Sequence, residues 1–222
     1  MVLVEAAVES VAAAQLAVAE GAGRLELCAD LARDGITPSA GLIRLVRARI
    51  EAPLHVLVRA RPGDFMYDRN ELAVMLADIA ECRRAGVDGV VIGALTREGT
   101  VDRTLTAALA RAARPLTVTF HRAVDRTPDI AAALTTLVEL GIERVLTSGG
   151  AASAAAGTPV LARLQLAFGG AIGLLAGGQV RAENVSGVVT GSGVREVHVG
   201  MPDGAEPGRV SGVVEVLRGS GR

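Results

Sequence analysis

Ionisable side chains in this sequence gather at the ends of short apolar runs. Carboxylates, guanidinium groups and imidazoles that share a pocket shift one another's pKa values, which is the usual setting for acid and base catalysis. Burying one such charge alone is costly, so each must pair with another, meet water or meet a ligand. The residues predicted to be catalytic on this basis are Glu26, Arg59, Arg61, Asp64, His121 and His198. A salt-bridge network that fills the interior of the protein is the alternative explanation.

The stretch from Arg59 to Tyr67 is the densest in polar side chains. Its two arginines, Arg59 and Arg61, are expected to point the same way and to clamp a carboxylate or phosphate group. Asp64 and Tyr67 are placed to orient them. An ordinary loop between a strand and a helix would not need two inward arginines, so this stretch predicts an anion site.

The three histidines differ in what they indicate. His121 ends an apolar run beside Arg122 and is the strongest candidate for a general acid or base. His198 ends the last such run and is expected to reach the same pocket as His121. His55 lies near the start of its run, where a hydrogen-bonded role in the core is the simpler prediction.

Two glycine-containing segments follow later apolar runs. They are Ser148 with Gly149, and Gly177 with Gly178. Their backbone N–H groups are candidates for binding an oxyanion or phosphate at the start of the following helix. Glycine is also common in plain turns, so each segment taken alone is a weak signal.

Strand-like and helix-like segments, which must position these residues, alternate along the chain. Strand-like runs begin near residues 2, 24, 54, 88, 116, 144, 172 and 195, and segments with helical spacing lie between them. Thr-Pro pairs at residues 37–38, 127–128 and 158–159 predict the starts of helices, because threonine can cap and proline fits the first turn.

Such an alternation allows either a closed barrel or an open doubly wound sheet. Central strands of an open parallel sheet are covered on both faces and are apolar on both. Here Arg24 and Glu26 share one face of a strand, while Leu25 and Leu27 share the other. We therefore predict an α/β protein of the TIM type, a (β/α)8 barrel whose site lies at the carboxyl ends of its strands.

The chain of 222 residues is expected to form a single barrel domain over residues 1–200. Residues 201–222 are predicted to be a closing segment with a short helix and a frayed tail. No Gly-x-Gly-x-x-Gly follows the first strand-like run, so no nucleotide cofactor is predicted.

The composition of the chain indicates which binding partners and which cellular compartment to expect. A formal net charge of −1 and an aromatic content of 2% argue against nucleic acid as a partner. No apolar run approaches the roughly 20 residues of a membrane span, and no basic leader precedes the first run. A soluble, cytoplasmic protein with no membrane partner is expected, in which the two cysteines stay reduced.

Several motifs together resemble the CutC family, whose name refers to copper homeostasis. They follow one another in the family's order between about residue 3 and residue 200. They are Arg24–Cys28, Gly35–Ser39, Arg59–Tyr67, Val118–Ala123, Leu146–Gly149 and Glu196–His198. The resemblance implies a TIM-type barrel, a cytoplasmic location, homo-oligomers and the binding of copper through cysteine thiolate.

On this chain the resemblance makes Cys28 the implied copper ligand, with Met66 as a helper from a loop. Soft sulfur ligands suit Cu(I). Relatives often carry cysteine where this chain has Ala6 and Ala7, and the segment after His198 is shorter here than in many of them.

Two functions follow. The first is a part in copper homeostasis with copper bound at Cys28, as the resemblance implies. The alternative is an enzyme, a lyase, isomerase or hydrolase, that acts on a carboxylated or phosphorylated small molecule at the mouth of the barrel. A barrel that only binds or regulates is a third possibility. The expected partner is a small anionic molecule or a metal ion.

Overall fold

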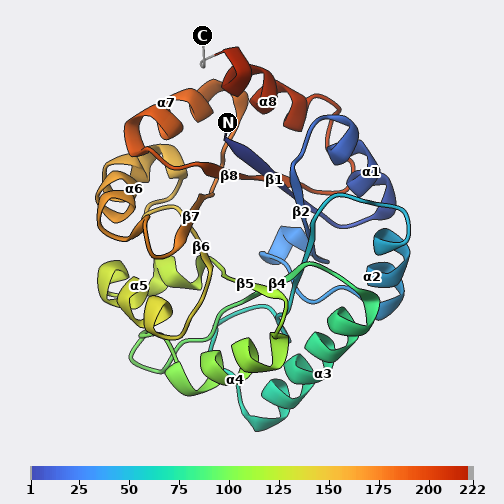
Figure 1. Cartoon of the computed structure of the whole chain (residues 1–222), viewed down its shortest axis with the longest axis vertical. Helices are drawn as coiled ribbons and strands as arrows, with labels where there is room; N and C mark the ends of the chain where they lie inside the picture. The colour runs from blue at the N-terminus through green and yellow to red at the C-terminus, as the bar shows by residue number, and fades with distance from the viewer. Residues whose placement is uncertain (1, 220–222) are drawn as a thin grey trace.

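Eight parallel strands form one closed barrel in the computed structural model, which describes residues 2–219. The strands follow in chain order around the barrel, and the last pairs with the first (Figure 1). They are β1 (Leu3–Val8), β2 (Arg24–Leu27), β3 (Leu54–Leu57), β4 (Gly89–Ile92), β5 (Thr117–Phe120), β6 (Arg144–Thr147), β7 (Gly173–Ala176) and β8 (Glu196–Met201). The predicted TIM-type barrel is confirmed, and every strand begins within one residue of its predicted start.

Eight α-helices surround the barrel as an outer ring among the described residues (Figure 1). They are α1 (Val11–Ala19), α2 (Ala40–Arg47), α3 (Arg69–Ala85), α4 (Arg103–Ala113), α5 (Ile130–Glu139), α6 (Ala154–Phe168), α7 (Ala182–Ser192) and α8 (Arg209–Gly219). Two short 3-10 helices, η1 (Leu31–Arg33) and η2 (Arg122–Arg126), lie in the loops after β2 and β5. The part of the expected frayed tail at residues 220–222 lies outside the described residues.

Serine and aspartate, rather than threonine, cap the helices that follow the Thr-Pro pairs. Ser39 accepts a hydrogen bond from the Leu42 N–H at the start of α2, and Asp129 accepts one from Ala132 at the start of α5. The first two pairs therefore come just before a helix but do not cap it.

The prediction of a helix start at Thr158-Pro159 is wrong, because this pair lies inside α6. That helix begins at Ala154 with Ser153 as its cap. A Cβ on Gly157 would lie 1.7 Å from the backbone oxygen of Ser148. The helix therefore packs closely on the loop after β6 before the chain reaches the proline, and this contact is invisible to local sequence patterns.

Each strand presents one face to the helices and the other to the barrel interior. The helix-facing residues of all eight strands belong to the main hydrophobic core, which includes Leu25, Val56 and Phe120. A separate, small apolar cluster of Cys28, Leu57 and Val91 lies on the inward face. This arrangement explains why the strands alternate polar and apolar residues.

Two arginines and two glutamates form a buried ion-pair chain across the inward face, near the amino ends of the strands. Arg24 contacts Glu5 and donates to Glu196 at 2.6 Å, and Arg144 donates to the same Glu196 oxygen at 2.7 Å. The salt-bridge network considered as an alternative therefore exists, but these residues on β1, β2, β6 and β8 form it. The residues predicted to be catalytic lie nearer the carboxyl ends, apart from His198, which contacts Glu5.

Candidate functional site

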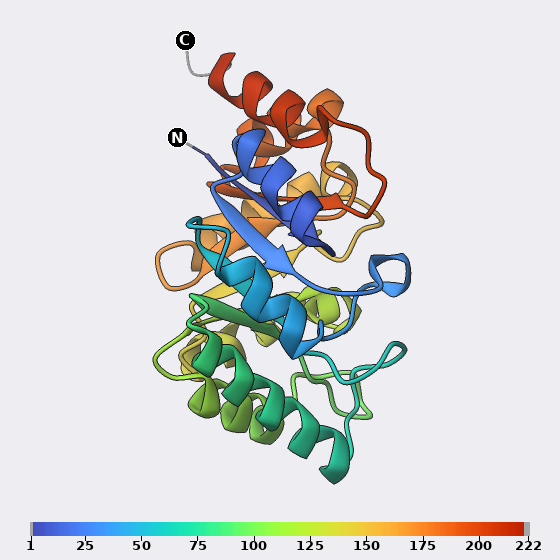
Figure 2. The same cartoon turned by 90° about the vertical axis from the view of Figure 1, so that its right-hand side faces the viewer.

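A cavity of about 390 Å³ opens at the carboxyl ends of the strands, where barrel enzymes and binding proteins carry their sites. Its walls come from strand residues, including His198 and Gly200 of β8, and from the loops after β2, β3, β5 and β7. Figure 2 shows several of these loops, including η1, projecting from one end of the barrel. The cavity is large enough for a small molecule or a bound ion.

Six of the residues predicted for the site line this cavity. They are Glu26, Cys28, Arg59, His121, Gly178 and His198. The other predicted residues, Arg61, Asp64, Ser148, Gly149 and Gly177, are not part of its lining.

None of the helices among residues 2–219 is long and apolar enough to span a membrane.

Glu5, Glu26 and His198 form a cluster that we call the cavity floor, in which Glu26 and His198 belong to the lining and Glu5 does not. One donor atom from each lies within 4.8 Å of the others. His198 Nδ1 lies 2.8 Å from Glu5 Oε1 and 3.5 Å from Glu26 Oε2. The register that pairs Glu5 with His198, and Ala7 with Glu26, brings β8, β1 and β2 together here.

The two glutamates of this floor have opposite electrostatic environments. Burial alone would raise the pKa of Glu5, but the hydrogen bond from His198 and the charge of Arg24 outweigh it and hold that pKa well below its usual range. Burial raises the pKa of Glu26 to about 7, and the His198 charge offsets it only in part, while Glu5 adds to it. Glu26 is therefore the carboxyl that exchanges a proton near neutral pH.

Glu26 also lacks the hydrogen-bond donors that a buried carboxylate normally has. It is 5% exposed, and among the described residues its one polar contact is His198 at 3.5 Å. Burial would lower the pKa of His198, but the hydrogen bond to Glu5 and the charges of Glu26 and Glu5 together raise it. The floor can thus hold a proton or a cation between Glu26 and His198.

Arg59 and Arg61 separate, although the sequence placed them on one face. β3 ends at Leu57, so strand alternation no longer applies by residue 61. Arg61 pairs with Asp64 at 2.9 Å and with Glu71 at the start of α3, outside the cavity. This cluster orders the loop that leads into α3.

Arg59 turns inward and is 3% exposed. Its guanidinium group donates to the carbonyl oxygens of Gly35 at 2.9 Å and Gly63 at 3.0 Å, and it lies 4.9 Å from the Phe65 ring centroid. No carboxylate among residues 2–219 lies within 4.0 Å of it, and its Nε has no partner. Arg59 therefore contributes an uncompensated positive charge to the cavity wall.

His121 is a neutral hydrogen-bond donor rather than a proton-accepting base. Burial, and then the charge of Arg59, lower its pKa to about 3. Nδ1 accepts the Ala123 N–H at 3.1 Å, so the ring proton sits on Nε2, which has no partner. The ring packs over Gly93, where a Cβ would lie 2.2 Å from Cε1, and it lies 4.9 Å from the Phe65 ring.

Cys28 lines the cavity as a protonated thiol. Its Sγ lies 3.5 Å from the Val8 carbonyl oxygen, to which it donates. Burial, and then the charges of Glu26 and Glu9, raise the thiol pKa far above its usual range.

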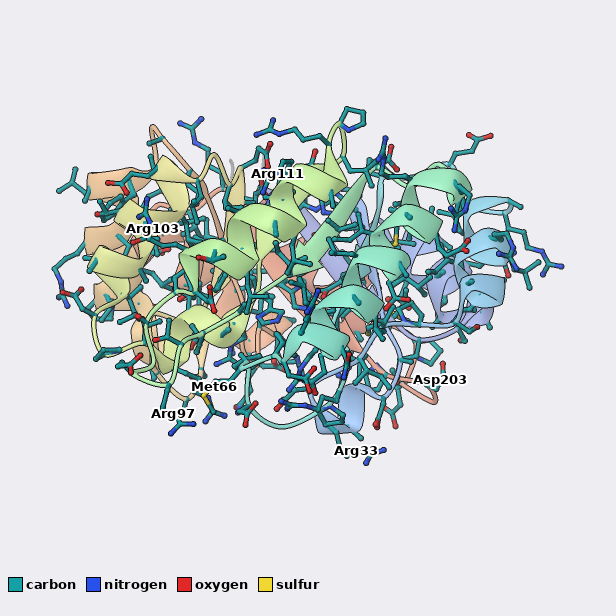
Figure 3. The ribbon with its side chains drawn as sticks, turned by 90° about the horizontal axis from the view of Figure 1, so that it is seen from below. Arg33, Met66, Arg97, Arg103, Arg111 and Asp203 are labelled. Atoms are coloured by element: carbon teal, nitrogen blue, oxygen red, sulfur yellow. The ribbon has the colours of Figure 1, made fainter. Side chains whose placement is uncertain are left out.

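The other sulfur atoms lie elsewhere among the described residues. Cys82 is buried in α3 within the outer core. Met66 does not line the cavity, and Figure 3 shows it on the outer edge formed by the loops, near Arg97. Cys28 is thus the single sulfur of the described cavity lining.

Asp125 accepts the N–H group of Ser148, one of the four that the sequence assigned to an anion, and also that of Gly150. The N–H groups of Ser148 and Gly150 each donate to its carboxylate at 3.0 Å. The Gly149 N–H donates to the Thr147 hydroxyl at 2.9 Å. The N–H groups of the loop after β6 are therefore already bound by a carboxylate from the loop after β5.

Gly177 and Gly178 differ from each other in the structure. The Gly177 N–H donates to the Thr147 carbonyl oxygen at 3.0 Å, so it is satisfied within the barrel. Gly178 lines the cavity with a φ of +102°, and the Nη1 atom of Arg122 lies 3.4 Å from the position its Cβ would take. Glycine there lets Arg122 lie against the loop after β7.

Sequence reasoning missed several residues of the inward face. Arg144 and Glu196 were not predicted for the site, and neither was Arg181, which lines the cavity. Applying the two-residue alternation to β6 and β8 as well as to β2 would have placed the first two on the inward face. No local pattern marks Arg181.

Comparisons with known proteins agree on one family. The model of the CutC family matches residues 2–202. A mouse protein named copper homeostasis protein cutC homolog is 44% identical over 196 residues, covering 88% of this chain and 72% of the mouse protein. A CutC family protein from Xanthomonas campestris pv. campestris (strain B100) is 46% identical over 194 residues, covering 87% of this chain and 81% of that protein.

Solved structures give the same fold. A structure described as copper homeostasis protein CutC from Streptococcus agalactiae has a TM-score of 0.85 and 30% identity, over 90% of this chain and 98% of that one. TrpF from Jonesia denitrificans shares the barrel with a TM-score of 0.66 and 16% identity, over 100% of this chain and 98% of that one, which shows the fold alone. With a matching family model and relatives of this similarity, the chain belongs to the CutC family, a family of copper homeostasis proteins.

Proposed function

We propose that this chain serves copper homeostasis by binding a copper ion at the cavity floor, between Glu26, His198 and Glu5. The observation that carries the proposal is the bare carboxylate of Glu26. It is buried and accepts no hydrogen bond among the described residues, yet it lies 3.5 Å from an imidazole nitrogen. A buried carboxylate in such a place is stabilised either by a proton or by a cation.

The donor set favours Cu(II) over Cu(I). Carboxylate and imidazole donors bind divalent first-row metals in an order that peaks at copper, whereas Cu(I) prefers soft sulfur. The ligand that the family resemblance implies, Cys28, is a protonated thiol already hydrogen-bonded to Val8. We propose that Cys28 contacts the ion only if it loses this proton, so the oxygen and nitrogen donors form the primary site.

Titration with each oxidation state tests the site. Cu(II), measured against a chelator of known affinity, is expected to bind at one ion per chain. Glu26→Gln should weaken this binding more than tenfold, because it replaces a ligand oxygen with an amide of the same shape. Asp34→Asn, which alters a carboxyl elsewhere in the cavity lining, serves as the control and should leave the affinity unchanged.

Cu(I) titration of reduced protein without oxygen separates the two candidate sites. Cys28→Ala is expected to have little effect on Cu(II), and Cys82→Ala is the control for the loss of a buried thiol. If Glu26→Gln leaves copper binding intact while Cys28→Ala abolishes it, the thiolate site is the correct one. Absence of saturable binding by either ion would remove copper binding from this chain altogether.

Location and assembly are part of the same proposal. We propose a cytoplasmic location, which both free thiols would suit. We also propose self-association, supported by the exposed apolar side chains Leu45 and Val74 on the neighbouring helices α2 and α3. Sedimentation equilibrium would contradict self-association if it gave the 22.6 kDa mass of one chain at all concentrations.

The enzyme alternative gains no support from the comparisons. The enzymes among the structural neighbours, such as thiamine phosphate pyrophosphorylase from Pyrococcus furiosus and TrpF from Jonesia denitrificans, are 12 to 16% identical to this chain. Likeness at that level concerns the barrel and not its chemistry.

A further inference from the structure

Positive charge without an acidic partner collects on the side of the cavity formed by β8 and the loop after β7. Arg181, the residue before α7, lines the cavity. Arg209, the first residue of α8, donates from Nη1 to the Gly200 carbonyl oxygen at 2.9 Å, and Gly200 also lines the cavity. The two guanidinium groups therefore approach the same edge of the opening.

Neither arginine has an acidic partner. Among residues 2–219, no carboxylate oxygen lies within 4.0 Å of either guanidinium group. Burial, and then the charge of Arg209, lower the pKa of Arg181, and the charge of Glu183 offsets them only in part. The two cations therefore repel each other, and an anion bound between them would relieve this repulsion.

Other features of this edge also favour a negative ligand. Arg122 lies against Gly178 in the loop that leads to Arg181. Arg181 precedes the first turn of α7, whose N-terminus carries positive dipole charge. The buried Arg59 adds a further unpaired cation to the cavity wall.

The two competing anion positions nearby are already filled by the protein. Asp125 accepts the N–H groups of the loop after β6. Glu20 accepts the N–H groups of Gly208, Val210 and Ser211 at the start of α8. Arg181 and Arg209 therefore remain available to an external anion beside β8 and the loop after β7.

We propose that the cavity binds a small phosphate-bearing molecule, whose phosphate lies between Arg181 and Arg209 at the loops after β7 and β8. Guanidinium groups match the oxygens of phosphate in pairs, and the loops after strands seven and eight are frequent phosphate sites in barrels of this type. This subsite lies at the rim and uses none of the proposed copper ligands.

Titration with inorganic phosphate, glycerol phosphate and acetate tests the proposal and separates free phosphate from a phosphate ester and a carboxylate. Binding is followed by calorimetry and by the phosphorus NMR signal at low salt. We expect saturable binding of the ester, weaker binding of inorganic phosphate and none of acetate. If all three anions bind equally weakly, or none binds, the proposal is overturned.

Arginine variants locate the site. Arg181→Gln and Arg209→Gln should each weaken phosphate-ester binding about tenfold, and the double variant should weaken it further. Arg111→Gln is the control, because Arg111 lies on the opposite edge of the barrel, away from the loops (Figure 3). An equal loss in Arg111→Gln would contradict the site, because the binding would then reflect overall charge.

Two further variants make failure of this proposal distinguishable from failure of copper binding. Glu26→Gln should retain phosphate binding, and Arg181→Gln should retain copper binding. Arg181→Lys keeps the charge and is the control for misfolding of the Arg181 variants. It should recover part of the affinity for the phosphate ester. Loss of phosphate binding in Glu26→Gln with Arg181→Gln unaffected would place the anion at the floor and overturn the rim site.

Discussion

Glu26 is the residue whose ionisation depends most visibly on its surroundings. Its neighbour Glu5 lies in the same floor yet keeps its charge, because Arg24 and His198 both contact it. Glu26 has only the more distant His198, and burial raises its pKa to about 7. Two carboxyl groups a few ångströms apart thus take different protonation states because their partners differ.

Glu26→Gln should change how stability depends on pH. In the folded protein Glu26 keeps its proton up to about pH 7, whereas an unfolded glutamate loses it near pH 4.5. The folded state therefore binds more protons between these values, and its stability falls as pH rises through that window. The raised pKa of His198 acts in the same direction, since its contribution is lost as pH rises through the folded value.

The amide variant removes the Glu26 part of this slope. It should gain stability relative to the native protein above pH 7, by on the order of 1–3 kcal/mol. Urea unfolding at pH 5, 6, 7 and 8 measures this difference in the free energy of unfolding, with Asp34→Asn as the control. A native protein equally stable at pH 5 and pH 8, with an unchanged profile in Glu26→Gln, would show that Glu26 ionises normally.

Asp125 links two elements that are far apart in the sequence. It lies in η2 after β5, and its carboxylate accepts from the Thr147 hydroxyl at the end of β6 and from two N–H groups in the loop that follows. Its side chain is 6% exposed and also pairs with Arg122 at 2.8 Å. This residue holds the loops after β5 and β6 in one arrangement at the cavity.

Asp125→Ala should therefore destabilise the barrel by about 3–5 kcal/mol, because it leaves backbone N–H groups and Arg122 without their acceptor. Urea unfolding measures the loss, and faster amide exchange at Ser148 and Gly150 would locate it. Asp129→Ala is the matched control: Asp129 only caps α5 through the Ala132 N–H, so about 1 kcal/mol is expected. Equal losses in the two variants would mean that Asp125 acts as an ordinary cap.

Local patterns predicted the elements of this fold well but predicted their contacts only in part. Alternation of polar and apolar residues placed Glu26 and His121 on the inward face, because both lie on or directly after a strand. The same rule failed at Arg61, which lies beyond the end of β3. The helix start predicted at residue 158 failed because the packing of Gly157 on Ser148 joins segments that sequence periodicity treats separately.

The polar interior of the whole barrel divides into two layers with different roles. Near the amino ends, Arg24, Arg144, Glu5 and Glu196 satisfy one another and join β1, β2, β6 and β8. Nearer the carboxyl ends, Arg59 and Arg181 have no carboxylate within 4.0 Å among the described residues, and Glu26 has only His198 at 3.5 Å. The sequence shows charges in both layers, but only the closed barrel reveals which are already paired.

Closure of the ring depends on a contact between the first and the last helix. Glu20, directly after α1, accepts the N–H groups of Gly208, Val210 and Ser211, which begin α8. Val214 of α8 packs against Gly21, where a Cβ would lie 3.4 Å from it. The first and last helices thus lie next to each other in the ring, as Figure 1 shows for α1 and α8.

Glu20→Ala should loosen α8 before it unfolds the barrel. Burial would raise the pKa of Glu20, but the three N–H donors outweigh it and lower that pKa, so the contact is present above about pH 4.5 and lost as pH falls through the folded value. The variant should cost about 1 kcal/mol at pH 7, and the cost should shrink as pH falls through the lowered pKa of Glu20. Amide exchange in α8, compared with α4 as the control, measures this, and equal acceleration in both helices would mean that Glu20 supports the whole barrel rather than its closure.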